Sequence, residues 1–263
     1  MNGIEAIILG IIQGLTEFFP ISSSGHLELA KTFFKTSIDP EESLFLVLTL
    51  HMATALSTLV VFRKEIIVIL KGLVELKQNE STRFSFKILL SMLPAVLVGL
   101  FLQTEIESLF SQNLLLIGIL LLLTSLLLFI ADKSKNTNLN VSFTHALVLG
   151  FVQAIAILPG LSRSGSTIAT AVLLGIDREK AARFSFLMVL PLIIGSMVKK
   201  MLDAENILEA SYGLPLVLGF LAAFFTGILA CKWMIELVKK SQLKYFSFYC
   251  FLVGGIAVAY EFF

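Results

Sequence analysis

The sequence predicts an all-α integral membrane protein with six transmembrane helices plus two re-entrant helical hairpins, arranged as two inverted-topology repeats. Three observations support this fold class: an apolar composition, two apolar segments that a polar turn interrupts, and a match between those two segments. Of the 263 residues, 57% are hydrophobic and 15% are charged, whereas about 25% of a typical soluble domain is charged. The apolar residues lie in long runs that one soluble core would not need, which indicates insertion into a membrane.

Six apolar runs have about the length that a helix needs to cross a membrane, which is about 20 residues. The predicted spans are residues 44–62, 84–102, 114–131, 184–198, 212–230 and 245–260. The stretches between them are predicted to be loops, including the charge-rich stretch near 63–87. No linker or low-complexity segment separates the spans, so we expect a single membrane domain.

Two further apolar stretches, residues 6–21 and 143–161, do not fit a simple crossing. The first is followed by a Ser-Ser-Ser-Gly-His turn and a short piece to residue 34. The second is followed by a Ser-Arg-Ser-Gly-Ser turn and a short piece to residue 176. In lipid, a broken backbone is tolerated only where protein or a water-filled cavity surrounds it. We therefore expect both stretches to form re-entrant hairpins buried in the protein.

The two interrupted stretches match each other at a fixed offset of 140 residues. The residues Ala6, Leu9, Gly10, Gln13, Ser22, Ser24 and Gly25 recur as Ala146, Leu149, Gly150, Gln153, Ser162, Ser164 and Gly165. We expect a first repeat at residues 1–131 and a second at 132–263, each with one hairpin followed by three crossings. Because three is odd, the second repeat is inverted in the membrane.

The distribution of basic residues predicts the orientation in the membrane. The loops near 63–87, 132–142, 177–183 and 231–244 hold 15 of the 20 Lys and Arg residues. The positive-inside rule places these loops in the cytoplasm and both termini outside. The net charge is only +1, and the basic residues are scattered among loops, so nothing indicates nucleic-acid binding.

The two polar turns have the composition of an anion-binding site. Each opens a short helix whose unpaired N–H groups and positive dipole end would face a shared cavity near the middle of the membrane. Hydroxyl groups are supplied by Ser22, Ser23, Ser24, Ser162, Ser164, Ser166 and Thr167. Arg163 adds a planar guanidinium that binds two phosphate oxygens at once. We therefore predict a phosphate site between the turns.

Ionisable residues within the apolar segments indicate the reacting groups. An arginine at the centre of a bilayer costs at least about 2.5 kcal/mol, so Arg163 is expected to serve function. Glu17 precedes the first serine turn by five residues, and Gln13 lies one helical turn earlier on the same face. His26 follows the serines and is a candidate general base or proton donor. The structural alternative is a Glu17–Arg163 ion pair without a catalytic role and a histidine that only packs locally.

At these residues the chain resembles a known family. Residues 13–26 (Gln-Gly-Leu-Thr-Glu-Phe-Phe-Pro-Ile-Ser-Ser-Ser-Gly-His) and 159–167 (Pro-Gly-Leu-Ser-Arg-Ser-Gly-Ser-Thr) resemble the two signature motifs of the undecaprenyl-diphosphatase, or bacitracin-resistance, family. The resemblance covers the whole chain in length, span count and repeat. It implies an enzyme of the bacterial plasma (inner) membrane that hydrolyses undecaprenyl diphosphate to undecaprenyl phosphate. This reaction recycles the carrier lipid for peptidoglycan synthesis, at a site open to the outer face.

The resemblance also implies site residues. The implied catalytic residues are Glu17, Ser23, His26 and Arg163, with Ser162 and Thr167 as phosphate contacts. Their neighbours in the two motifs are further candidates for substrate binding: Gln13, Ser22, Ser24, Gly25, Ser164 and Gly165. A divalent cation, Mg²⁺ or Ca²⁺, is implied as well, with Glu17 as its candidate ligand. Family members often have glutamate where this chain has Gln13, so we expect the cation to arrive bound to the diphosphate.

The sequence leaves several alternatives open. Ser23 is expected either to be the nucleophile or to orient the attacking water, with Glu17 or His26 taking its proton. The main alternative function is a transporter or flippase for a polyprenyl phosphate, because transporters also use inverted repeats with broken helices. A phosphohistidine mechanism is disfavoured, because the second turn has Ser166 where a second histidine would be needed. A homodimer is compatible with the sequence. His51 and His145 do not follow a serine turn as His26 does, and both are expected to be structural.

Overall fold

A computed structural model describes residues 2–34, 40–74, 79–101, 114–203 and 213–262 of the chain. Within these ranges the chain is helical, with one isolated β-bridge between Leu139 and Ile176. The helices are α1 (Gly3–Phe18), α2 (Ser23–Phe34), α3 (Pro40–Val61), α4 (Arg63–Val74), α5 (Glu80–Phe101), α7 (Leu114–Asp132), α8 (Phe143–Ile155), α9 (Arg163–Leu173), α10 (Arg178–Asp203), α11 (Gly213–Lys239) and α12 (Leu243–Phe262). The all-α prediction is confirmed. Residues 102 and 212, at the ends of two predicted spans, lie outside the described residues.

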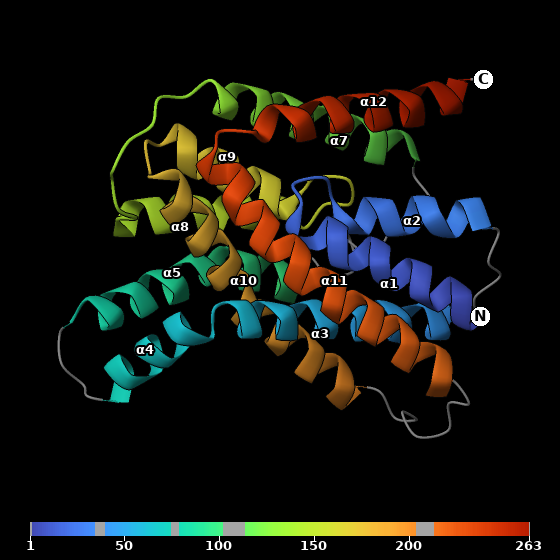
Figure 1. Ribbon diagram of the computed structural model, residues 1–263, viewed down its shortest axis with the longest axis horizontal. Helices are drawn as coiled ribbons and strands as arrows, with labels where there is room; N and C mark the ends of the chain where they lie inside the picture. Colours follow the sequence, from blue (N-terminus) through green and yellow to red (C-terminus); the bar gives the residue numbers. More distant parts are fainter. Residues whose placement is uncertain (1, 35–39, 75–78, 102–113, 204–212, 263) are drawn as a thin grey trace.

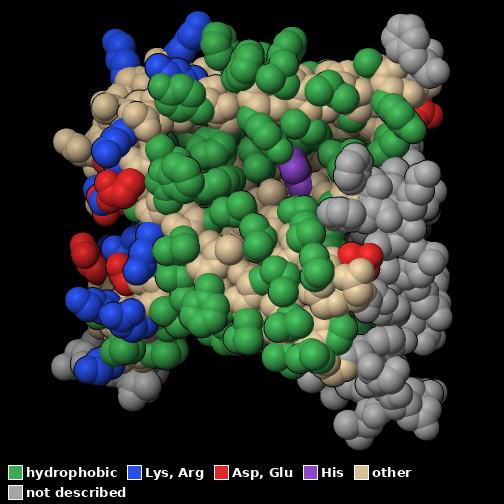
Figure 2. Space-filling model, turned by 45° about the vertical axis from the view of Figure 1, so that its right-hand side comes forward, with side chains coloured by type: hydrophobic (Ala, Val, Ile, Leu, Met, Phe, Trp, Pro, Cys, Tyr) green, Lys and Arg blue, Asp and Glu red, His purple; other side chains and the backbone are tan. Residues whose placement is uncertain are grey.

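Four helices are long and apolar enough to cross a membrane, namely α5, α7, α11 and α12. A fifth candidate is the pair of α3 and α4, which are bent by 77° at their junction. Figure 2 shows hydrophobic side chains over most of the visible face, as expected for a surface in contact with lipid. The chain is therefore a multi-pass membrane protein. The helix α10 contains the predicted span 184–198 but does not meet the same criterion, so the described residues support four or five of the six predicted spans.

The prediction of a loop near 63–87 is wrong. Helix α4 fills its first part, and α5 begins at Glu80. Helix α4 has only 12 residues and includes Arg63, Lys64 and Lys71, so its sequence has neither the length nor the composition of a span. In the structure α4 packs against α5, and Ile66 of α4 packs against the main hydrophobic core. This tertiary contact supplies the burial that a short helix needs.

The first helix of each interrupted stretch packs against a helix that is distant in the sequence. Helix α1 packs against α11, and α8 packs against α5. Glycine allows both close approaches. A Cβ atom at Gly10 would lie 2.3 Å from the carbonyl oxygen of Gly219, and one at Gly150 would lie 2.5 Å from the carbonyl oxygen of Ser91. The two contacts therefore use residues that the 140-residue offset relates.

Helices α7 and α12 lie side by side along the top of Figure 1. Reciprocal hydrogen bonds join them: the Ser125 hydroxyl donates to the Ser247 carbonyl (2.7 Å), and the Ser247 hydroxyl donates to the Ser125 carbonyl (2.8 Å). Below this pair, the largest buried cluster includes Phe184, Phe186 and Met188 of α10. The core thus holds α10 against the two interrupted segments.

The predicted interruptions are present. The first break comprises residues 19–22, between α1 and α2, and the second comprises residues 156–162, between α8 and α9. The breaks meet near the middle of the molecule (Figure 1), where the Ser164 hydroxyl donates to the Phe19 carbonyl (3.3 Å). A Cβ atom on Gly165 would lie 3.1 Å from Cβ of Pro20. This contact brings the N-terminal ends of α2 and α9 together.

Candidate active site

Glu17 lies in the last turn of α1 and connects the two breaks. Its side chain is 7% exposed. One carboxylate oxygen, Oε2, accepts hydrogen bonds from Gln13 Nε2 (3.1 Å) and Ser23 Oγ (2.8 Å). The other oxygen, Oε1, accepts from Nη2 of Arg163. The helical spacing of four residues places Gln13 beside Glu17, as the sequence predicted.

Arg163 is the first residue of α9 and is held by the cap of that helix. Ser162 is the N-cap residue: its hydroxyl accepts from the Gly165 N–H (3.0 Å), and its own N–H donates to the Thr124 hydroxyl (3.1 Å). The second amino group of Arg163, Nη1, is buried and has no hydrogen-bond partner in the described part of the chain. A buried guanidinium donor without an acceptor is suited to binding an oxyanion.

A narrow pocket opens beside the Glu17–Arg163 pair. It is lined by Glu17, Phe18, Thr54, Thr58, Arg163, Phe186, Val189 and Ile193. One wall carries the ion pair and two threonines, and the rest is apolar. This combination suits a ligand with an anionic end and an apolar body.

The serine turn of the first break has an unusual backbone. Ser22 has φ +70°, in the left-handed region, where a non-glycine residue costs about 1–2 kcal/mol. Its hydroxyl accepts from the Gly25 N–H (3.4 Å) and lies 3.5 Å from the Ser24 hydroxyl. The turn directs the next side chain, Ser23, toward Glu17. The strain at Ser22 thus lies one residue from the candidate nucleophile.

His26 does not contact Glu17 or Ser23 through any hydrogen bond in the described residues. Its Nδ1 lies 2.8 Å from the Ser22 carbonyl oxygen, and its Nε2 lies 2.8 Å from the Tyr249 hydroxyl. His26 therefore belongs to the same turn as the catalytic candidates but faces α12.

The predicted hydroxyls of the second turn bond mainly within the hairpins. The Ser162 hydroxyl lies 3.4 Å from that of Ser164. The Thr167 hydroxyl donates to the Arg163 carbonyl (2.7 Å) and lies 2.6 Å from the Ser185 hydroxyl. Ser164 and Gly165 form the contact with the first break. The role of these residues in substrate binding stays a prediction.

Three residues of α3 that the sequence analysis did not assign to the site lie close to it: His51, Thr54 and Thr58. These residues line one face of α3, and His51 Nε2 lies 3.8 Å from Oε2 of Glu17. The Nδ1 atom of His51 lies 2.8 Å from the Val47 carbonyl, so Nδ1 carries the proton. The signal was available: a histidine inside an otherwise apolar span is a candidate for function. His145, by contrast, is partly buried and belongs to the cap of α8.

The described residues contain no group of three or more His, Cys, Asp or Glu side chains that could hold a metal ion. Near the ion pair, the oxygen donors are the Glu17 carboxylate and Oε1 of Gln13, which is buried and has no hydrogen-bond partner among the described residues. Carboxylate and amide oxygens suit Mg²⁺ and Ca²⁺. Two such oxygen ligands suit a cation that takes most of its other ligands from a bound substrate.

A family model described as Bacitracin resistance protein BacA matches residues 6–256. A protein of Christiangramia forsetii named undecaprenyl-diphosphatase is 55% identical over 262 residues, covering 100% of this chain and 99% of that protein. A protein of the same name from Bacteroides fragilis is 48% identical, covering 98% of each chain. Another of the same name from Methanococcus vannielii is 39% identical, covering 97% of this chain and 99% of its own.

Proposed function

The chain belongs to the bacitracin resistance protein BacA family, and from this premise we propose how its two breaks carry out the reaction. It is a membrane-embedded undecaprenyl-diphosphatase, which hydrolyses undecaprenyl diphosphate to undecaprenyl phosphate and phosphate. The reaction returns the carrier lipid to cell-wall synthesis and confers bacitracin resistance. The observation that carries the mechanism is the buried Glu17–Arg163 pair, with Ser23 hydrogen-bonded to the same carboxylate.

Arg163 binds the diphosphate. Its free donor Nη1 and the adjoining N-terminal ends of α2 and α9 provide positive potential for phosphate oxygens. Phosphoryl transfer depends mainly on positioning and on stabilising the charge of the transferred group. Binding of the substrate would also give the buried Nη1 of Arg163 an acceptor. The isoprenoid chain leaves the site along the apolar side of the pocket.

Ser23 and Glu17 carry the proton transfer. In the covalent route, Ser23 Oγ attacks the terminal phosphorus, the bond from phosphorus to the bridging oxygen breaks, and undecaprenyl phosphate leaves. The hydroxyl proton passes to Glu17 Oε2, 2.8 Å away. Water then hydrolyses the phosphoserine and regenerates Ser23. In the direct route, Ser23 orients a water molecule that attacks the same phosphorus and gives its proton to Glu17.

A divalent cation would bind with the diphosphate. Glu17 and Oε1 of Gln13 would supply its protein ligands, and phosphate oxygens would supply others. When bound, the cation would neutralise charge on the phosphate groups. Arg163 remains the fixed positive group of the site.

We assign six spans and two re-entrant hairpins to two inverted repeats, residues 1–131 and 132–263. The packing of the helices supports this assignment. Helix α1 opens the first half and contacts α11 of the second half, whereas α8 opens the second half and contacts α5 of the first half. The helix caps support it too. Asn2 and Glu5 form a capping box at the start of α1, and Ser142 and His145 form one at the start of α8, at the same offset of 140.

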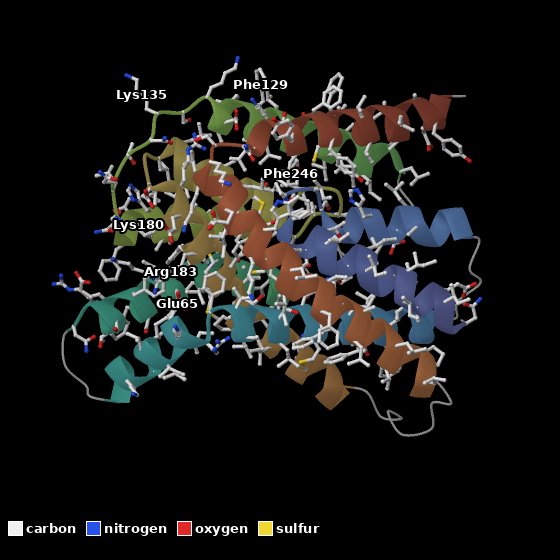
Figure 3. The ribbon with its side chains drawn as sticks, viewed as in Figure 1. Glu65, Phe129, Lys135, Lys180, Arg183 and Phe246 are labelled. Atoms are coloured by element: carbon white, nitrogen blue, oxygen red, sulfur yellow. The ribbon has the colours of Figure 1, made fainter. Side chains whose placement is uncertain are left out.

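The site is assigned to the outer face, with both termini outside. The two termini lie at one end of the molecule in Figure 1. Lys and Arg side chains gather along the opposite end (Figure 2), and Lys135, Lys180 and Arg183 lie there in Figure 3. The positive-inside rule places that basic end in the cytoplasm.

The test is phosphate release from undecaprenyl diphosphate by the purified protein in detergent, with and without Mg²⁺ or Ca²⁺. We expect release that requires the cation and is lost in Arg163→Ala. A trapped phosphate ester on Ser23 would select the covalent route, and full activity of Ser23→Ala would exclude it. Lipid movement in vesicles that persists in Glu17→Gln while hydrolysis stops would add the transport function.

A further inference from the structure

The hydrogen bonds of His26 define which of its nitrogens carries the proton. A carbonyl oxygen only accepts hydrogen bonds, so the 2.8 Å contact to the Ser22 carbonyl requires a proton on Nδ1. In the neutral ring, Nε2 is then an acceptor. The Tyr249 hydroxyl, 2.8 Å from Nε2, must therefore donate to it. The geometry fixes one tautomer and one direction for both hydrogen bonds.

Tyr249 also holds the plane of the His26 ring. The two rings stack at a centroid distance of 5.5 Å and an interplanar angle of 18°. Tyr249 belongs to α12, the last helix, whereas His26 lies in the first turn of α2. Two neighbours of Tyr249 contact the first break as well: Phe246 packs against the Phe19 ring (5.2 Å), and Cys250 Sγ lies 3.5 Å from the Pro20 carbonyl. Phe246 is labelled in Figure 3 near the centre of the molecule.

The His26 ring acts on the strained residue of the break. Both its Nδ1–H and its backbone N–H (3.1 Å) donate to the carbonyl oxygen of Ser22. Ser22 is the residue with φ +70°, and Ser23, which follows it, donates to Glu17. A chain of contacts therefore runs from Tyr249 through His26 and Ser22 to the candidate nucleophile.

We infer that Tyr249 is a positioning residue of the active site: by donating to Nε2 of His26, it orients the imidazole that holds the Ser22 carbonyl and so presents Ser23 to Glu17. This inference rests on the proposed function, because it assigns Tyr249 a part in that reaction. It also gives His26 a role in shaping the turn. Tyr249 touches neither Glu17 nor Arg163 through a described hydrogen bond, so its effect passes through His26.

The test compares Tyr249→Phe with Tyr245→Phe. Both changes remove one phenolic oxygen from α12, and Tyr245 is 61% exposed, with its ring beside Lys244. Loss of one hydrogen bond to the imidazole is expected to lower kcat about tenfold in Tyr249→Phe, with little change in KM. Tyr245→Phe is expected to stay within about twofold of the unchanged enzyme. In a His26→Ala background, Tyr249→Phe should cause no further loss.

A second measurement reads the hydrogen bond without activity. The chain has three histidines, so ¹⁵N-histidine labelling with His51 and His145 variants assigns the His26 signals. We expect a protonated Nδ1 and an acceptor Nε2, whose signal moves in Tyr249→Phe and not in Tyr245→Phe. An unchanged kcat, or equal losses with and without His26, would overturn the inference. Lack of phosphate release by the unchanged protein, with the expected ¹⁵N signals, would instead count against the proposed function.

Discussion

The first and second breaks share a backbone pattern. In the first, the Ser22 hydroxyl accepts from the Gly25 N–H, and the Ser22 carbonyl accepts from the N–H of the residue four positions on (3.1 Å). In the second, Ser162 accepts from Gly165 in the same way, and its carbonyl accepts from the N–H four positions on (2.8 Å). The same arrangement of caps therefore opens both short helices.

The side chains on this shared pattern differ. At the offset of 140, Ile157 and Ser166 of the second half stand where the first half has Glu17 and His26. Arg163 stands at the position of Ser23. The first break thus supplies the Glu17 carboxylate and the Ser23 hydroxyl, and the second supplies the Arg163 guanidinium. Neither break alone contains the set that the reaction needs, so the site exists only where the two meet.

The surroundings of the breaks differ as well. Around the second break, Ala156 and Leu161 form an apolar cluster with Leu120 of α7. Beside the first break, α12 presents Tyr249 to His26. Each break also has a polar partner on a distant helix: the Thr124 hydroxyl at the second break and the Tyr249 hydroxyl at the first. The comparison teaches that one hydrogen-bond pattern carries two different sets of polar side chains, which complement each other where the breaks meet.

Removal of the Arg163 guanidinium is expected to have the largest effect on activity. Arg163→Ala leaves the Glu17 carboxylate buried without its ionic partner, a change that costs about 3–5 kcal/mol. We expect kcat/KM to fall by at least about 10³-fold. Arg163→Lys keeps the charge but loses the second donor, and it should retain more activity than Arg163→Ala. Phosphate release measures both, and near-normal release in Arg163→Ala would contradict the division of chemistry between the breaks.

Removal of the carboxylate charge is next. Glu17→Gln keeps the shape and some hydrogen bonds but cannot take the proton of Ser23. We expect a loss of kcat of about 10²–10³-fold, as is usual for a general base. Gln13→Ala, on the same helix face, keeps the charge of Glu17 but removes the amide that donates to it and the Oε1 proposed as a cation ligand. A similar loss in both variants would show that the hydrogen-bond network, not the charge, is the essential feature.

Much of this comparison was predictable from the sequence, because local patterns encode it. The polar turns, their offset and the buried Glu17 and Arg163 are visible in the order of residues. Contacts between distant helices are not. Nothing in the sequence places Tyr249 beside His26, 223 residues away, and the charges around α4 hide its buried face. His51 was predicted to be structural because its neighbours in sequence are apolar, and no pattern in the sequence indicates that it lies 3.8 Å from Glu17.

A third test concerns His51 of α3, a helix that belongs to neither break. His51→Leu removes the imidazole 3.8 Å from the Glu17 carboxylate and makes this face of α3 apolar. We expect a loss of kcat/KM of about tenfold, because an apolar side chain beside the buried carboxylate disfavours its charged form. His145→Leu is the matched control, because His145 is partly buried at the start of α8, away from Glu17, and it should stay within about twofold. Equal phosphate release by the two variants would return His51 to a structural role.

The smallest expected effect separates the two serines that cap the short helices. Ser162 has φ −70°, and Ser162→Ala removes a regular N-cap, which costs about 1 kcal/mol of stability. Ser22 has φ +70°, a conformation that glycine adopts without strain. Ser22→Gly is therefore expected to stay within about 0.5 kcal/mol of the unchanged protein, since relief of strain offsets the loss of a 3.4 Å hydrogen bond and the added backbone entropy.

Thermal unfolding in detergent compares these two variants. Trp233, the one tryptophan of the chain, packs against Phe19 of the first break (5.4 Å) and reports on that region by fluorescence. We expect Ser162→Ala to lower the Tm by about 2–4 °C and Ser22→Gly to leave it nearly unchanged. A larger loss in Ser22→Gly would mean that the Ser22 hydroxyl, rather than its backbone conformation, holds the first turn. The two breaks would then share the same capping energetics as well as the same hydrogen-bond pattern, and only their reactive side chains would distinguish them.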